Sequence, residues 1–145
     1  MKTGMQIHEV MTNTPVTVSP TATVQETALL MTKKNVNSVL VVKNDQILGI
    51  VTDEDMVRRI VTQSSPATQE PISAIMVKDP FIISPGQDLM DAIVLMGDND
   101  IRHLPVVDKK KLVGFITMRD ILKMEPELVE LLSRDTLQRE EEQNL

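Results

Sequence analysis

The chain contains no cysteine, no tryptophan and no tyrosine, and it has only two phenylalanines and two histidines. Without cysteine, disulfide bonds, thiol catalysis and thiolate metal sites are excluded. Two histidines are too few for the usual all-protein zinc site, so we expect no metal ion. The shortage of aromatic rings argues against the folds that bind nucleic acids by stacking bases on aromatic side chains.

Long apolar runs and an excess of positive charge are also missing. No apolar run approaches the length of a membrane span, and the polar N-terminus has no signal-peptide apolar stretch. We therefore expect a cytoplasmic protein without membrane insertion. Acidic residues outnumber basic ones by 21 to 15, and the net charge of −6 argues against a nucleic-acid partner.

The 145 residues amount to about one domain, and they contain an internal repeat. Shifted by 65 residues, the sequence matches itself without a gap from residue 7 to residue 59. The identical pairs include Met11 and Met76, Pro15 and Pro80, Gly49 and Gly114, Thr52 and Thr117, and Asp55 and Asp120. Two copies are too few for an open solenoid, so we expect a closed pair related by a pseudo-twofold axis.

Both copies predict the same order of elements, β-α-β-β-α. Short strands are expected at Val16–Val18 and Phe81–Ile83, and helices are expected to begin at about Thr23 and Asp88. β-Branched runs joined by polar turns predict two hairpins, with strands at 38–42, 47–51, 103–107 and 112–116. A final helix is expected to begin at Thr52 and at Thr117.

These elements divide the chain into a first repeat at 5–63, a linker at 64–71 and a second repeat at 72–125. Since about 50 residues bury a sheet poorly, the two sheets are expected to pack on each other with the helices outside. The fold class is therefore α/β (α+β). Residues 126–145 form an acidic tail with leucines at helical spacing, which predicts an amphipathic helix used in dimer or partner contacts rather than in a ligand site.

One motif, Gly-x-x-Thr-x-x-Asp, occurs where a strand meets a helix in each copy, at 49–55 and 114–120. A capping box explains it simply, because Thr at the N-cap and an acid three residues later satisfy free amide groups. The same geometry suits a nucleotide: a helix start attracts phosphate, and an Asp one turn later can accept hydrogen bonds from ribose hydroxyls. The motif alone leaves both interpretations open.

Together these segments resemble a tandem pair of CBS (cystathionine β-synthase) domains, a Bateman module, over residues 5–125. Met-x-x-x-Pro at Met11 and Met76 resembles the family's opening, Ile101–Asp108 resembles its middle strand, and Gly-x-x-Thr-x-x-Asp resembles its nucleotide signature. The resemblance implies clefts that commonly bind AMP, ADP, ATP or S-adenosylmethionine, with no cofactor required. It also implies a stand-alone regulatory homodimer that modulates a partner enzyme or transporter.

The resemblance assigns nucleotide binding to Thr117, Asp120, Arg102, His103, Thr52, Asp55, Ile82, Thr17, Phe115 and Ile50. The second copy is expected to bind phosphate more tightly, because Arg102 and His103 replace Asn37 and Ser38 of the first copy. Simpler roles remain for each: a solvated arginine, a half-buried histidine with one satisfied nitrogen, and core packing for the apolar residues.

Enzyme functions have little support, and we expect no catalytic residues. The glycines lack the spacing of a dinucleotide fingerprint or a P-loop, and no serine lies in a nucleophile elbow. The alternatives are a structural or adaptor module without ligand, in which Thr and Asp act only as caps, and a binder of S-adenosylmethionine or nucleic acid.

Overall fold

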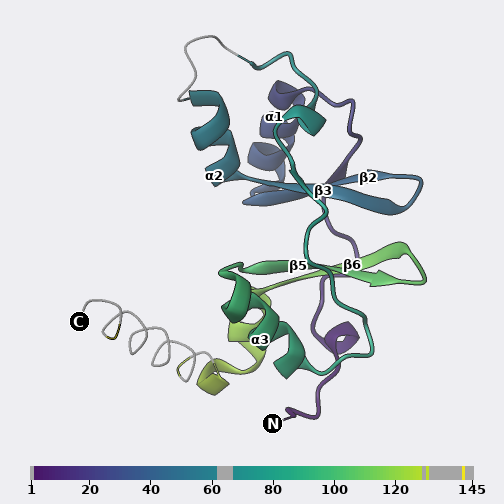
Figure 1. The fold of residues 1–145 in the computed structure, drawn as a ribbon, viewed down its shortest axis with the longest axis vertical. Coiled ribbons are helices and arrows are strands. Elements are labelled where there is room, and N and C mark those ends of the chain that lie inside the picture. The colour runs from purple at the N-terminus through teal and green to yellow at the C-terminus, as the bar shows by residue number, and fades with distance from the viewer. Residues whose placement is uncertain (1, 62–66, 129, 131–141, 143–145) are drawn as a thin grey trace.

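The computed structural model describes residues 2–61, 67–128, 130 and 142, and in it two β-sheets face each other with helices on their outer sides (Figure 1). The first sheet has the order β1-β2-β3-β4, with strands Thr17–Val18, Ser38–Lys43, Gln46–Thr52 and Val77–Lys78. The second sheet pairs β5 (His103–Asp108) with β6 (Lys111–Thr117). The α/β class and the layer order predicted from sequence are confirmed.

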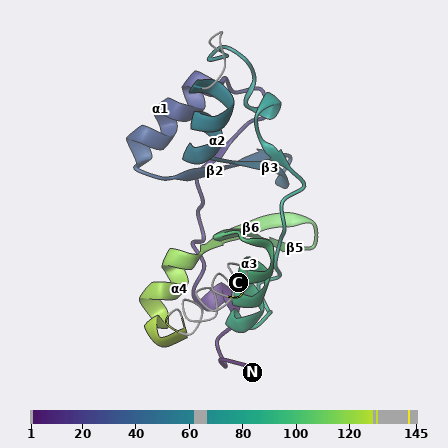
Figure 2. The ribbon, with the colours of Figure 1, turned by 60° about the vertical axis from the view of Figure 1, so that its left-hand side comes forward.

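Two helices cover the outer side of each sheet (Figure 2). Helices α1 (Val24–Lys34) and α2 (Asp53–Met56) lie on the first sheet, and α3 (Leu89–Asn99) and α4 (Met118–Met124) lie on the second. The two long helices begin as predicted, because Thr23 caps α1 and Asp88 caps α3, each within a capping box. Helix α2 continues as a π-helix, η2 (Val57–Val61). Among the described helices, none combines the length and apolar character needed to cross a bilayer.

The two hairpins repeat each other in register. Ser38 pairs with Thr52 as His103 pairs with Thr117, and a bulge follows Val41 in one hairpin and Val106 in the other. Both two-residue turns, Asn44–Asp45 and Lys109–Lys110, have positive φ at each position, as a type I′ hairpin turn requires. The shift of 65 residues read from the sequence is therefore a true structural repeat.

The predicted strand at Phe81–Ile83 is wrong. Only Ile83 bridges to Val106, although the equivalent segment of the first copy forms β1. In the first copy, the amide of Leu40 donates to the carbonyl of Val16 at 3.1 Å. Pro105 replaces Leu40 in the second copy and has no N–H, so this ladder bond cannot form.

The segment that opens each copy packs on the other copy, an exchange that the repeat pattern did not predict. Strand β4, from the second copy, extends the first sheet by pairing with Gly49 and Ile50 of β3. In return, Thr12 of the first copy pairs with Phe115 of β6. The spatial units of the fold therefore differ from the sequence repeats.

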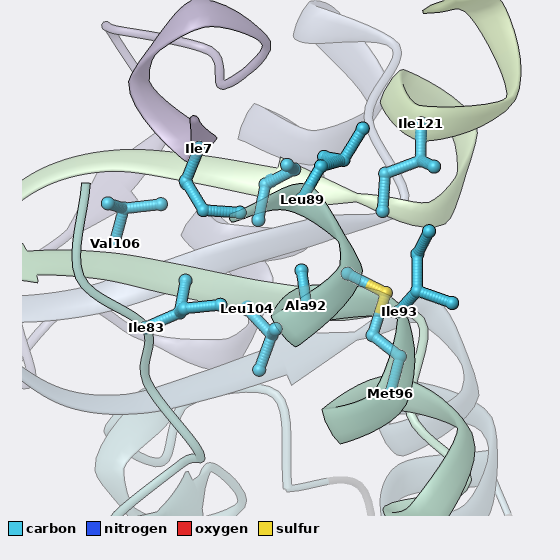
Figure 3. Packing of buried hydrophobic residues seen from close by; sticks show 10 residues of the cluster. Ile7, Ile83, Leu89, Ala92, Ile93, Met96, Leu104, Val106 and Ile121 are labelled. Atoms are coloured by element: carbon cyan, nitrogen blue, oxygen red, sulfur yellow. The ribbon is translucent and has the colours of Figure 1, made fainter. Parts of the chain in front are cut away.

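The two hydrophobic cores show the same exchange. Ile7 lies on the 3-10 helix η1 (Ile7–Glu9) and is fully buried in the core of the second copy, among Leu89, Ile93 and Ile121 (Figure 3). Ile72, on the 3-10 helix η3 (Ile72–Ala74), is fully buried in the core of the first copy. Each core is therefore completed by a residue from the other repeat.

The N-terminal arm, residues 3–12, is tied to the start of α3. The backbone amide and hydroxyl of Thr3 donate to Asp88 Oδ1 at 2.9 and 3.0 Å, and the amide of Gly4 donates to Oδ2 at 3.1 Å. The hydrogen bond from the Thr3 amide, followed by that from the Met90 amide, lowers the pKa of Asp88 to about 2. Asp88 thus caps α3 and holds the arm with one carboxylate.

The linker and the tail are described only in part. Residues 67–71 pack against the first copy, where the amides of Val24 and Gln25 donate to the carbonyls of Glu70 and Thr68. Residues 126–128 are helical, and Leu128 packs against the core of the second copy. Most of the predicted tail helix, 126–145, lies outside the described residues.

Candidate functional site

Several of the candidate residues lie on the inner faces of the two sheets. Side chains alternate along a strand, and Leu104, Val106 and Ile116 belong to the core under the helices, so their neighbours point the other way. The second sheet therefore presents His103, Pro105, Phe115 and Thr117 toward the first. By the same alternation, the first sheet presents Ser38, Leu40, Ile50 and Thr52.

The Thr and Asp of each motif form a complete capping box. The Thr117 amide and hydroxyl donate to Asp120 Oδ2 at 2.9 and 3.0 Å, and the Asp120 amide donates back to Thr117 Oγ1 at 3.2 Å. Thr52 and Asp55 make the same three bonds at 2.9, 3.1 and 3.2 Å. Within the described residues, Oδ1 of each Asp accepts no hydrogen bond, so the box leaves one carboxylate oxygen for a further donor.

The glycine of each motif has a packing role. A Cβ at Gly49 would lie 2.6 Å from Met76 Sδ and 2.8 Å from the Val77 carbonyl, and a Cβ at Gly114 would meet Met11 Sδ. Only glycine lets the exchanged segment approach this closely. The sequence showed Met11 and Met76 only as the start of a motif, and it gave no signal that each methionine packs on the other copy's glycine.

His103 and Phe115 form a stacked pair beside the second box. Their ring centroids are 6.2 Å apart and their planes are inclined by 24°. His103 is half-buried and lies opposite Thr117 in the strand register. Within the described residues its imidazole makes no hydrogen bond or ion pair, so the satisfied nitrogen of the simpler interpretation is not found there.

Arg102 immediately precedes β5, and its backbone contacts the first residue of α4. Its carbonyl accepts a hydrogen bond from the Met118 amide at 2.8 Å, and the residue is exposed. The structure thus brings Arg102, His103, Phe115, Thr117 and Asp120 together at one end of the β5–β6 hairpin.

The other candidates differ in accessibility. Ile82 is 48% exposed, whereas the next residue, Ile83, is buried in the core of the second copy. Thr17 occupies the equivalent exposed position of the first copy. Ile50 is only 3% exposed, which suits packing between the sheets. Of the two candidate isoleucines, Ile82 therefore leaves more apolar surface open.

Local charge also differs between the two boxes. The first turn of α2 carries Asp53 and Glu54 in addition to Asp55, and Glu54 pairs with exposed Arg58 at 3.7 Å. The equivalent positions in α4 are Met118 and Arg119. The second box is the more favourable one for an anion.

Comparison with known proteins places this fold in a family. The family model of the CBS domain matches residues 7–62 and 72–127. The CBS domain-containing protein YhcV of Bacillus subtilis is 36% identical over 115 residues, which make up 79% of this chain and 81% of that protein. A protein with CBS domains from Burkholderia ambifaria has a structure that matches with a TM-score of 0.77 at 28% identity, over 85% of this chain and 96% of the other. The CBS domain pair of protein MJ0100, in complex with 5′-methylthioadenosine and S-adenosyl-L-methionine, matches with a TM-score of 0.74 at 21% identity, over 83% and 94% of the two chains.

Two β-α-β-β-α repeats that exchange their opening segments and carry paired Thr-Asp boxes define a closed domain pair. The chain belongs to the CBS-domain family and is a tandem pair of CBS domains. In the parts of the chain that the structure describes, no group of three or more His, Asp or Glu side chains is placed to hold a metal ion.

Proposed function

We propose that this CBS pair is a cytoplasmic regulatory module that binds an adenine nucleotide, AMP, ADP or ATP, and thereby modulates a partner enzyme or transporter. The observation that carries the proposal is the gathering of Arg102, His103, Phe115, Thr117 and Asp120 at one end of a hairpin. The adenosyl ligands of the related MJ0100 pair support an adenosine-containing ligand.

Each residue of this cluster has a chemical role in the proposal. Asp120 Oδ1 accepts a hydrogen bond from a ribose hydroxyl, because the other oxygen is used in the box. Arg102 and His103 face the phosphate, for which arginine offers a fork of donors. Phe115 and Ile82 supply apolar surface for the base.

The first copy offers a weaker site for the same ligand. Thr52 and Asp55 repeat the box, and Thr17 and Ile50 replace Ile82 and Phe115. The acids on the first turn of α2 repel phosphate, so this site favours an adenosyl ligand with fewer negative charges. S-Adenosylmethionine is the second candidate ligand, and we propose it only for the site of the first copy.

A thermal-shift screen with AMP, ADP, ATP, S-adenosylmethionine and NAD tests the proposal. A ligand that binds only the folded state raises the melting temperature by mass action. Arg102→Ala should weaken AMP binding by about 1–2 kcal/mol, on the scale of a charged hydrogen bond, and the matched control Asn37→Ala should not. No shift with any adenine ligand would favour the adaptor alternative, in which the boxes are only caps.

The homodimer is part of this proposal and rests on exposed apolar side chains. Val57 and Leu122 occupy equivalent positions after the two boxes and are 56% and 41% exposed. A second copy that covers both would remove this surface from water. Sedimentation equilibrium should show a dimer that Val57→Glu weakens, while a monomeric wild type would contradict it.

A further inference from the structure

Met11 and Met76 occupy the same position in the two repeats, and each lies on the segment that packs on the other repeat. Met76 packs against the core of the first copy, and Met11 packs against the core of the second. Both residues are half-buried, so each keeps part of its surface in contact with solvent. Each methionine is therefore accessible in part while it helps to join the two repeats.

The sulfur atom of each methionine lies over the backbone of a glycine. A Cβ at Gly49 would lie 2.6 Å from Met76 Sδ and 2.8 Å from the carbonyl oxygen of Val77. Met11 Sδ takes the same place over Gly114. Each sulfur therefore fills the space that a side chain at the glycine would need, and little room is left around it.

An oxygen atom added to either sulfur would fit this environment poorly. A thioether is apolar and adapts to a narrow space, whereas a sulfoxide is polar and larger. The backbone polar atoms nearest to the two Cβ positions are the carbonyl oxygens of Val77 and Thr12, which cannot donate a hydrogen bond. A polar group that is buried without a hydrogen-bond donor costs free energy. Oxidation should therefore loosen the contact between the methionine and the glycine.

We propose that Met11 and Met76 are modification sites, at which a hydroperoxide oxidises the thioether to a sulfoxide and thereby loosens the joint between the two repeats. A sulfur lone pair attacks the terminal oxygen of the hydroperoxide, and the O–O bond breaks as the new S–O bond forms. The sulfur is oxidised by two electrons and the hydroperoxide is reduced. The departing oxygen takes the hydroperoxide proton and leaves as water or an alcohol. The inference goes beyond the proposed function, because it requires no nucleotide.

The backbone pairing next to each methionine connects this modification to a candidate site. Val77, which follows Met76, pairs with Ile50 in the first sheet. Thr12, which follows Met11, exchanges two backbone hydrogen bonds with Phe115 in the second. Ile50 and Phe115 are both candidate ligand residues. Displacement of either methionine would therefore weaken the strand pairing beside one candidate site.

Treatment of the full chain with hydrogen peroxide, followed by mass-spectrometric peptide mapping and urea unfolding, tests the proposal. Met124 is 50% exposed and should be oxidised first, without a change in the urea midpoint. Met31 and Met96 are 6% and 1% exposed and should remain thioethers while the chain is folded. Oxidation of Met11 and Met76 should coincide with a fall in the midpoint, and methionine sulfoxide reductases should restore it.

The double variant Met11→Leu, Met76→Leu isolates the two sulfurs, because leucine nearly conserves the volume and cannot form a sulfoxide. After the same treatment the double variant should keep its midpoint, while the matched control Met124→Leu should lose stability as wild type does. Equal losses in wild type and the double variant would overturn the inference.

Two outcomes in wild type alone would also overturn it, so the test does not depend on how well the double variant folds. The first is oxidation of Met11 and Met76 without a fall in the urea midpoint. The second is that both remain thioethers after Met124 has been fully oxidised.

Discussion

Thr12 and Phe115 exchange two backbone hydrogen bonds, from the Thr12 amide at 2.8 Å and from the Phe115 amide at 3.0 Å. The pair joins the opening segment of the first repeat to the strand that carries the His103–Phe115 stack. From Thr12 the chain crosses to Thr17 of the first copy within a few residues. One short segment thus connects the two candidate sites.

Substitution of either motif glycine, Gly49 or Gly114, should destabilise the fold. Gly49→Ala places a Cβ 2.6 Å from Met76 Sδ and 2.8 Å from the Val77 carbonyl, and it should lower the free energy of unfolding by about 1–3 kcal/mol through overpacking. Gly114→Ala should behave alike. The control is Gly97→Ala, within α3 and with open space around it, which should stabilise by about 0.5–1 kcal/mol. Urea unfolding measures all three, and a neutral Gly49→Ala would show that the exchanged segment is not tightly packed.

Truncation of Ile7 or Ile72, each of which is buried in the core of the other repeat, should destabilise both repeats together. Ile7→Ala and Ile72→Ala each empty a fully buried position, which costs about 2–5 kcal/mol. Because each residue completes the core of the other repeat, both variants should unfold in one cooperative transition that is shifted as a whole. Two separate transitions in circular dichroism would mean that the repeats are independent.

Acid should weaken the hydrogen bonds by which the Asp88 carboxylate holds the N-terminal arm. The pKa of Asp88 is lowered from 3.8 to about 2 in the folded chain, so its contribution is present above pH 4 and is lost as the pH falls toward 2. The difference in stability between wild type and Asp88→Asn should therefore shrink over that window. Asp98→Asn, an exposed neighbour on α3 whose carboxylate accepts no hydrogen bond in the described part of the chain, is the control. A stability difference that stays constant from pH 5 to pH 2 would contradict this role of Asp88.

Asp120 should show two separable effects. Asp120→Ala removes a capping partner, which costs about 0.5–2 kcal/mol of stability, and Asp55→Ala should cost a similar amount. Only Asp120→Ala should also weaken AMP binding strongly, by about 1.5–3 kcal/mol for a charge-assisted hydrogen bond. Chemical unfolding and calorimetry report the two effects independently. Unchanged AMP affinity in the double variant would leave both carboxylates with a capping role alone.

Sequence reasoning succeeded where the signal is local. The caps at Thr23, Asp88, Thr52 and Thr117 are each set by residues within one helical turn, and all four helices begin beside them. The hairpins are also local, because a polar two-residue turn between β-branched runs fixes their register.

The parts that sequence missed depend on distant partners. Strand β4 has two residues and no alternating pattern, and it forms only because Gly49 and Ile50 present an open edge. The loss of the strand at Phe81–Ile83 follows from Pro105, a residue more than twenty positions away. In the candidate site, the two Thr-Asp motifs are visible in the sequence, but the stacking of His103 on Phe115 required the register of β5 and β6.

The position of Ile7 has a consequence for how the chain is made. Ile121 is among its partners in the second core, so Ile7 leaves the ribosome long before all the residues that bury it have been synthesised. At the usual rates of translation this delay is on the order of ten seconds. The first core can close once Ile75 has emerged, whereas the arm stays uncovered until the second repeat follows. The N-terminal arm is therefore synthesised before both cores and is among the last of these segments to fold.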